Sequence, residues 1–150
     1  LHEDMPASLM YVDMDNFKLV NDVHGHQTGD EAILALTQIL LENTRPIDLV
    51  ARLGGDEFVI WLDGADMATA SQRARILLDK SAALSSFSGA KDQPLGISVG
   101  IAIREPDSKE PLEQLVLRAD QTMYQVKKHG KGSFGIAAPP GSDDPAKIED

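Results

Sequence analysis

The chain has 150 residues, a formal net charge of -10 and no cysteine, so it fits one domain and excludes disulfides and thiolate metal sites. The acidic balance argues against a DNA or RNA polymer as partner, because such binding depends on many contacts from Lys and Arg to phosphates. No apolar run approaches the ~20 residues of a membrane span and no signal peptide is recognisable, so we expect a cytoplasmic protein.

The first half of the chain predicts one strand, two helices and a hairpin. After a leader over 1–7, the predicted elements are a strand at 8–12, helices at 17–22 and 31–42, and hairpin strands at 49–52 and 56–62. A loop is expected at 24–30, where Thr28 or Asp30 could cap the second helix. Gly54 and Gly55 suit the two central turn positions, since glycine takes positive φ without steric cost.

The second half predicts two more helices around a strand of unusual pattern. The expected elements are a helix at 66–84, a strand at 95–103, a helix from Pro111 to Gly130 and an edge strand at 133–137. The strand at 95–103 alternates bulky and small residues, which gives it one bulky face and one small face. Residues 138–150 are acidic and proline-rich and are expected to be a disordered linker after a domain at 1–137. The fold class is α/β (α+β), with at least one antiparallel hairpin.

Two acidic positions carry the chemistry. Asp13 ends the first strand and Asp56 follows the glycine turn, so their carboxylates converge if the two strands are neighbours. Carboxylate and carbonyl oxygens are the ligands of Mg²⁺, and two such ions about 4 Å apart can activate a hydroxyl for phosphoryl transfer. Glu57 is next to Asp56 in a strand and should point to the opposite face, which implies a different role. Taken alone, Asp13 would be a strand-end cap.

The motifs together resemble the GGDEF family, the diguanylate cyclases. Those motifs are RLGGDEFVI at 52–60, VDMDNFK at 12–18 with Asn21, Asp22, Gly25, His26, Gly29 and Asp30, ISVGIA at 97–102, and the helix segment at 119–130. The resemblance covers residues 8–136 and implies a central mixed, largely antiparallel sheet flanked by helices, like the palm of nucleotide cyclases. Lys131-Gly132 stands where the family usually has Arg-Asn, and the family's opening segment with its helix is missing, which suggests a piece of a longer protein.

The resemblance implies that two GTP molecules are joined into cyclic di-GMP with release of two pyrophosphates, in a homodimer fused to sensory or output domains. Mg²⁺ (or Mn²⁺) would be held by Asp13, the Met14 carbonyl and Asp56, while Glu57 would orient the hydroxyl, act as general base or bind a second ion. The implied substrate residues are Asn21 and Asp30 for guanine, Lys18, Lys127 and Lys131 for phosphates, and Gly54 and Gly55 at the turn. Five residues separate Asp48 from Gly54, the spacing of an inhibitory RxxD site formed by Arg45 and Asp48.

Plainer interpretations stand beside these. Lys18 alone would be a surface lysine, Lys127 a partner of the helix dipole, and Arg45 with Asp48 a local ion pair. A catalytically silent GGDEF domain could bind GTP or cyclic di-GMP as a regulatory module, although the intact acidic motif speaks against it. A palm-type nucleotidyltransferase acting on a polymer is disfavoured by the acidic surface and the guanine pair.

Overall fold

A six-stranded sheet with the order β2-β3-β1-β4-β5-β6 organises the protein, which a computed structural model describes for residues 4–149. The strands are β1 (Ala7–Asp15), β2 (Leu49–Gly54), β3 (Glu57–Asp63), β4 (Gly96–Arg104), β5 (Phe134–Ile136) and β6 (Lys147–Ile148). The helices are α1 (Phe17–His24), α2 (His26–Glu42), α3 (Met67–Ser81) and α4 (Leu112–His129), with a 3₁₀ helix at Ala82–Phe87. Only the β4–β5 pair is parallel, so the expected mixed, largely antiparallel sheet is confirmed.

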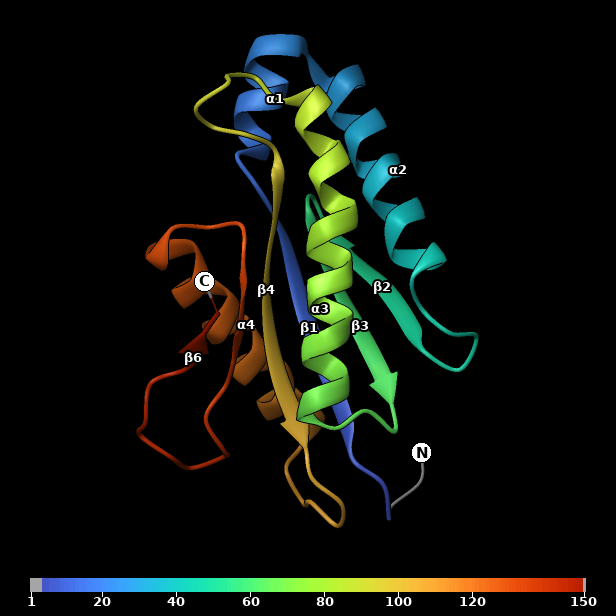
Figure 1. Ribbon diagram of the computed structural model, residues 1–150, viewed down its shortest axis with the longest axis vertical. Coiled ribbons are helices and arrows are strands. Elements are labelled where there is room, and N and C mark those ends of the chain that lie inside the picture. Colours follow the sequence, from blue (N-terminus) through green and yellow to red (C-terminus); the bar gives the residue numbers. More distant parts are fainter. Residues whose placement is uncertain (1–3, 150) are drawn as a thin grey trace.

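β1 is the central strand and is buried on both faces (Figure 1). Met10 and Val12 pack in the larger core under α2 and α3, whereas Leu9 and Tyr11 pack against α4 on the opposite face. This explains why the sequence of β1 is almost continuously apolar, as expected for an internal strand. Both neighbours of β1, β3 and β4, run antiparallel to it and carry the hairpin and the small-residue pattern seen in the sequence.

The small face of β4 lets α4 approach the sheet very closely. A Cβ atom placed on Gly100 would lie 2.1 Å from the carbonyl oxygen of Ala119 and 2.3 Å from the amide nitrogen of Met123. Both atoms belong to the backbone of α4 and cannot move aside as a flexible side chain could. Glycine at this position therefore sets the distance between the sheet and α4.

Four sequence expectations differ from the structure. α2 already begins at His26, so most of the expected loop at 24–30 is helical, and Gly25, with φ 92°, takes the N-cap position instead of Thr28 or Asp30. The hairpin turn is one residue later than expected: Gly54 pairs with Glu57, which leaves Gly55 and Asp56 in the turn. The helix predicted at 66–84 ends at Ser81 and continues as the 3₁₀ helix. β5 is not an edge strand, because β4 and β6 flank it.

The expected linker also contains structure. Lys147–Ile148 form β6, which pairs with Ile136 and Gly135, and the amide of Glu149 donates to the carbonyl of Phe134 at 2.9 Å. Of the expected leader, residues 1–3 lie outside the described part, as does Asp150 at the other end, and β1 begins at Ala7. Across residues 4–149, no helix combines the length and the apolar character needed to cross a bilayer.

Candidate active site

The ends of β1 and of the β2–β3 hairpin bring the acidic residues together. Asp13 is paired with Glu57 across the β1–β3 ladder, and the amide of Met14 donates to the carbonyl of Asp56 at 3.2 Å. The backbone thus fixes the hairpin turn against the end of β1. Asp13 therefore lies at the same end of the sheet as Asp56 and Glu57, which are more than 40 residues away in the sequence.

Lys127 of α4 reaches into this group. Its ammonium lies 2.9 Å from Asp13 Oδ2 and donates to the carbonyl oxygen of Met14 at 2.8 Å. Burial raises the pKa of Asp13 to about 7; Lys127 opposes this rise, whereas the neighbouring Asp56 carboxylate adds to it. The carboxylate therefore sits in a place where negative charge is costly and a cation is favoured.

The donor set at this point fits a hard divalent cation. Asp13 Oδ1 is buried and has no hydrogen-bond partner among the described residues, so one carboxylate oxygen is left to coordinate. The Met14 carbonyl supplies a second oxygen and Asp56 a second carboxylate next to it. No cluster of three or more His, Cys, Asp or Glu side chains within the described residues is arranged to hold a metal, and the set here depends on the carbonyl instead.

Glu57 is held from the α4 side of the sheet by a residue that the sequence did not single out. The hydroxyl of Tyr11 donates to Glu57 Oε2 at 2.7 Å. Burial first, and then this hydrogen bond, raise the pKa of Tyr11, so the phenol stays protonated as a donor. Burial, with the charge of Glu57, also raises the pKa of Asp120 on α4. One oxygen of Glu57 is thus fixed by Tyr11.

The hairpin turn is held by Arg52 and is open above its two glycines. Arg52 donates from Nε and Nη2 to the carbonyl oxygen of Gly55, at 2.9 and 2.7 Å. Gly54 and Gly55 have φ values of 135° and 50°, and a Cβ on either would meet no atom within 4 Å. The glycines are required by the backbone conformation, and the space beside them is free for a ligand. The sequence shows an arginine two residues before the glycine pair, but it does not reveal that this arginine holds the turn through the Gly55 carbonyl.

The two expected guanine-binding residues come from the α1–α2 corner. Asn21 of α1 abuts Gly29 of α2, where a Cβ would lie 1.9 Å from Asn21 Oδ1. Asp30 is the next residue and is exposed on α2. Gly29 thus allows the Asn21 carboxamide to lie directly beside the start of α2. Lys18 is different: its side chain is 89% exposed and its ammonium pairs with Asp22 at 2.8 Å, so it lies in solvent on the surface of α1.

Lys131 reaches the same end of β1 from the turn after α4. Its ammonium donates to Asn16 Oδ1 at 2.9 Å. The turn itself is tied to the sheet, because the amide of Gly132 donates to Asp15 Oδ2 at 3.0 Å. Asp15 also accepts a 2.7 Å hydrogen bond from the hydroxyl of Ser98 on β4. Asp15 and Ser98 were not expected as site residues, although both lie within motifs that the sequence displays.

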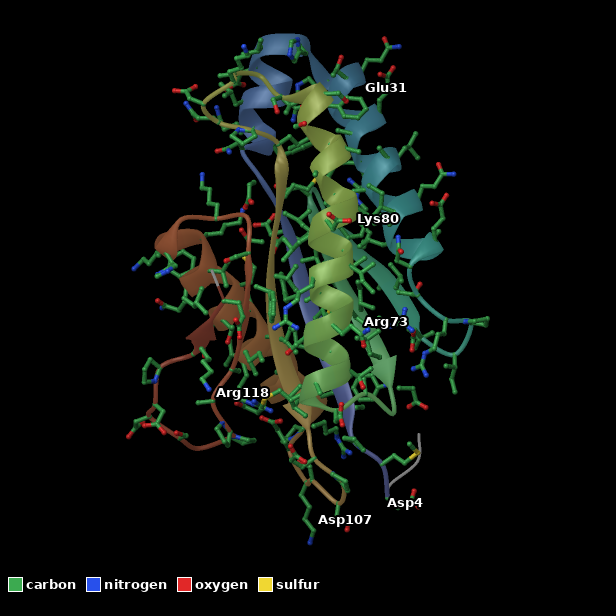
Figure 2. The ribbon with its side chains drawn as sticks, viewed as in Figure 1. Asp4, Glu31, Arg73, Lys80, Asp107 and Arg118 are labelled. Atoms are coloured by element: carbon green, nitrogen blue, oxygen red, sulfur yellow. The ribbon has the colours of Figure 1, made fainter. Side chains whose placement is uncertain are left out.

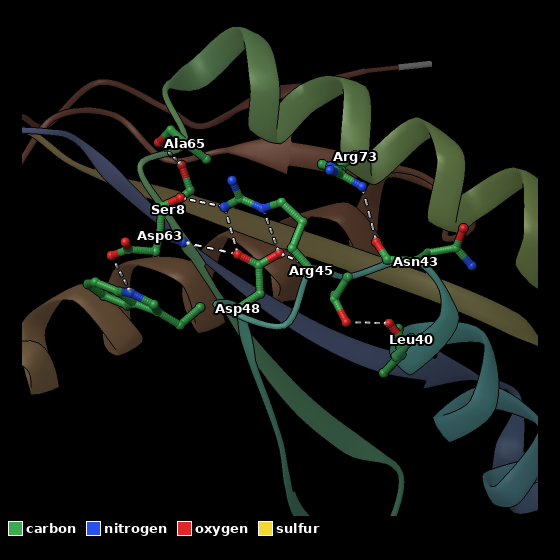
Figure 3. A network of polar contacts seen from close by, with 10 residues as sticks. Ser8, Leu40, Asn43, Arg45, Asp48, Asp63, Ala65 and Arg73 are labelled. Atoms are coloured by element: carbon green, nitrogen blue, oxygen red, sulfur yellow. Dashed lines mark hydrogen bonds and ion pairs between the residues drawn. The ribbon is translucent and has the colours of Figure 1, made fainter. Parts of the chain in front are cut away.

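Arg45 and Asp48 form a closed network between α2 and β2 (Figure 3). Asp48 Oδ1 accepts from Arg45 Nη2 at 2.8 Å and from the amide of Asp63 at 3.3 Å, while Oδ2 accepts from the backbone amide and Nε of Arg45. Arg45 Nη2 also donates to the carbonyl of Asp63. Burial alone would raise the pKa of Asp48, but the hydrogen bonds from Arg45 outweigh it and lower this pKa. The geometry is that of an ion pair that joins the α2–β2 turn to the end of β3.

A cavity of about 820 Å³ lies elsewhere, between α4 and the segment 137–148. Arg118 of α4 contributes to its wall and is itself anchored by Glu110 at 2.8 Å and by the carbonyl of Ala138 at 3.0 Å (Figure 2). None of Asp13, Asp56 and Lys127 contributes to its lining. The cavity is therefore separate from the acidic end of the sheet.

Comparison with known proteins agrees with this arrangement. The model of the family described as "Diguanylate cyclase, GGDEF domain" matches residues 1–133. Probable diguanylate cyclase DgcC of Escherichia coli K12 is 36% identical over 132 residues, covering 88% of this chain and 35% of DgcC. The active GGEEF domain of a diguanylate cyclase from Vibrio cholerae has a TM-score of 0.79 at 26% identity, covering 90% of this chain and 85% of that one.

A second similar structure is the GGDEF domain of DgcB from Caulobacter crescentus in complex with c-di-GMP, with a TM-score of 0.74 at 27% identity over 87% of this chain and 77% of that one. The chain spans between 19% and 35% of the length of the curated relatives DgcC, DosC, YtrP and MucR. The sequence motifs, the sheet and the family match agree with one another, and the chain belongs to the GGDEF family.

Proposed function

We propose that this chain is a diguanylate cyclase domain, which joins two GTP molecules into cyclic di-GMP and releases two pyrophosphates. The observation that carries the proposal is the meeting of Asp13, Asp56 and the Met14 carbonyl beside the ammonium of Lys127. Carboxylates, a carbonyl and a cationic side chain around one point are what a phosphoryl-transfer site needs to bind a triphosphate. The relatives named as diguanylate cyclases support the same activity.

Asp13, Asp56 and the Met14 carbonyl would hold Mg²⁺ or Mn²⁺. When bound, that ion supplies the positive charge that favours an ionised 3′-hydroxyl and a charged phosphate. Glu57, fixed through Oε2 by Tyr11, presents its other oxygen to the attacking hydroxyl and accepts its proton. Lys127 and Lys131 neutralise phosphate oxygens, and the open glycine turn leaves room for them.

Guanine is read at the α1–α2 corner. Asp30 accepts from the N1–H and the exocyclic amine of guanine, and Asn21 supplies both a donor and an acceptor. Adenine would leave these groups unpaired, so GTP is the substrate. Each domain holds one GTP, and each 3′-hydroxyl attacks the α-phosphate of the other molecule, so two copies of the domain face each other during the reaction. The domain works in the cytoplasm, where GTP is available, within a longer protein that carries sensory or output domains.

Cyclic di-GMP would inhibit the enzyme through Arg45 and Asp48. A guanidinium can take a phosphate bidentately and stack on guanine. Because the two side chains bind each other, the product has to open this ion pair before it can use both of them. This requirement weakens product binding, so inhibition would begin only at high product concentration.

One experiment tests the activity. The protein is incubated with GTP and MgCl₂ at two dilutions and as a fusion to a dimeric coiled coil, and the nucleotides are separated by chromatography. We expect cyclic di-GMP in all three, with a specific rate that falls on dilution of the unfused chain and not of the fusion. GTP or cyclic di-GMP binding with no product, even from the fusion, would favour the silent regulatory module instead.

A further inference from the structure

Asp15 joins three elements around the candidate site. It is the last residue of β1 and only 3% exposed, and each of its carboxylate oxygens accepts a hydrogen bond from a different element. Oδ1 accepts from the Ser98 hydroxyl of β4 at 2.7 Å and lies 3.7 Å from the Lys127 ammonium, and Oδ2 accepts from the Gly132 amide after α4 at 3.0 Å. The Gly132 amide also lies 3.1 Å from Ser98 Oγ, so both polar side chains hold the same backbone group.

The turn that Asp15 holds has an unusual backbone. Gly130, Lys131 and Gly132 have φ values of 148°, 65° and 67°, so three successive residues lie at positive φ. For a non-glycine residue such as Lys131 this conformation is strained and persists only where the surroundings impose it. The hydrogen bonds to Gly132 constrain the chain directly after Lys131, together with the 3.0 Å bond from the Val99 amide to the Ser133 carbonyl, while the amide of Lys131 itself donates to the Val126 carbonyl at 3.1 Å.

This backbone conformation determines where the Lys131 side chain lies. Its ammonium lies 2.9 Å from Asn16 Oδ1, directly after the end of β1, while Lys127 lies 2.9 Å from Asp13. The two ammonium groups thus approach the same end of the sheet from α4 and from the turn that follows it. Lysine has a flexible stem, so its head reaches a fixed point only if its backbone is fixed.

We propose that Asp15 is a positioning residue, which acts through Gly132 to hold Lys131 where it meets the substrate's phosphates. The inference rests on the proposed function and adds a residue that does not itself touch the nucleotide. It also explains how lysine can serve where the family usually has arginine. The clamp fixes the backbone from which the Lys131 ammonium, a point charge, reaches the phosphates.

The test measures nucleotide binding with and without phosphates. Calorimetry with MgCl₂ measures the binding of 3′-deoxy-GTP, which lacks the attacking hydroxyl. NMR titration measures the binding of 3′-deoxyguanosine, which carries no phosphates. For Asp15→Ala we expect about 10-fold weaker binding of the triphosphate, the size of one charge-assisted contact, and unchanged binding of the nucleoside. Lys131→Met should show the same loss, and the double variant should be no worse than Lys131→Met alone.

The matched control is Glu110→Gln. It removes the charge of a different buried carboxylate, which pairs with Arg118 of α4 outside the candidate site. It should lower the melting temperature and leave both affinities unchanged. If Asp15→Ala does not fold, Asp15→Asn replaces it in the same comparison of single and double variants. Asparagine keeps the shape of the aspartate side chain and loses its charge. An additive loss in the double variant, or an equal loss for the nucleoside, would overturn the positioning role. A wild type that binds no triphosphate would instead overturn the proposed function and this inference with it.

Discussion

The ammonium of Lys127 lies 2.9 Å from the Asp13 carboxylate and also donates to the Met14 carbonyl. These are the oxygens that would hold a metal ion, so the lysine and a divalent cation compete for them. Binding of the cation would therefore be linked to release of Lys127 towards the phosphates. The same side chain would first neutralise Asp13 and then the substrate.

Lys127→Met should bind Mn²⁺ about 10-fold more tightly than the wild type, because it removes a positive charge only a few ångströms from the cation. Calorimetry with MnCl₂ and no nucleotide measures this directly. Lys128→Met is the matched control, since the ammonium of Lys128 lies 5.1 Å from the centre of the Tyr124 ring. Equal or weaker Mn²⁺ binding by Lys127→Met would show that the lysine does not compete.

Asp13 should make the protein less stable as the pH rises. Burial raises its pKa to about 7, so between an unfolded value of about 3.9 and pH 7 the folded state binds the proton more tightly. The free energy of unfolding from this group therefore falls with rising pH across that window. Asp13→Asn lacks the titration and should gain stability relative to wild type from pH 4 to pH 8, in urea titrations with EDTA. A constant difference would contradict the raised pKa.

Asp56→Asn should abolish cyclic di-GMP formation and leave the melting temperature near that of the wild type. Asp56 lies in the hairpin turn and offers the metal a charge, and its contact with Met14 is made by its backbone carbonyl, which asparagine keeps. Chromatography of the nucleotides and a circular-dichroism melt give the two results. A mutant with wild-type turnover would remove Asp56 from the metal site.

GTP should be used at least about 100-fold better than ATP, since adenine offers Asp30 and Asn21 no matching hydrogen bonds, and hydrogen bonds to a charged carboxylate are the stronger ones. Asp30→Ala should reduce this ratio of kcat/KM values by weakening the use of GTP. Glu31→Ala changes the exposed neighbour on α2 and is the control (Figure 2). If both variants keep the wild-type ratio, Asp30 does not read the base.

Arg45→Ala should weaken binding of cyclic di-GMP by about 10-fold or more, because it removes a guanidinium that can bind phosphate bidentately. It also leaves Asp48 buried without its partner, so the melting temperature should fall as well. Arg104→Ala, which removes a guanidinium bound to the Ser108 carbonyl, is the control. Calorimetry well below the melting temperature separates the two effects, and equal affinities would leave Arg45 as a turn residue.

Local patterns predicted most elements well. The apolar run of β1, the alternation in β4 and the helical periodicity of α4 each appear within one element and are visible in the sequence. The meeting of Asp13 with Asp56 followed from two strand ends, given that the strands are neighbours. The first three features depend on short-range chemistry, whereas the meeting of the two carboxylates also needs β1 to pair with β3.

What escaped prediction depends on contacts between side chains and backbone that no local pattern reveals. Gly29 suggested a loop, yet it lies within α2, where glycine is needed because the Asn21 side chain fills the space of a Cβ. The hairpin turn lies one residue later because the register of the β2–β3 pairing shifts between Arg52 and Gly54. The side chain of Arg52 also donates a hydrogen bond to the Gly55 carbonyl. β6 is held by backbone pairing with β5, which its composition does not reveal. Asp15 binds the Gly132 amide only because the fold brings the turn after α4 next to the end of β1.

The close approach at Gly100 has a consequence for how activity can be tuned. Because the backbone of α4 rests directly on this glycine, one added methyl group would lift the helix as a unit. Lys127 projects from the last turn of that helix, so a change in the middle of the sheet would alter its reach at the rim. The size of the residue at position 100 thus sets how close the Lys127 ammonium comes to Asp13 at the candidate site. A substitution there would change the candidate site through a residue that lies outside it.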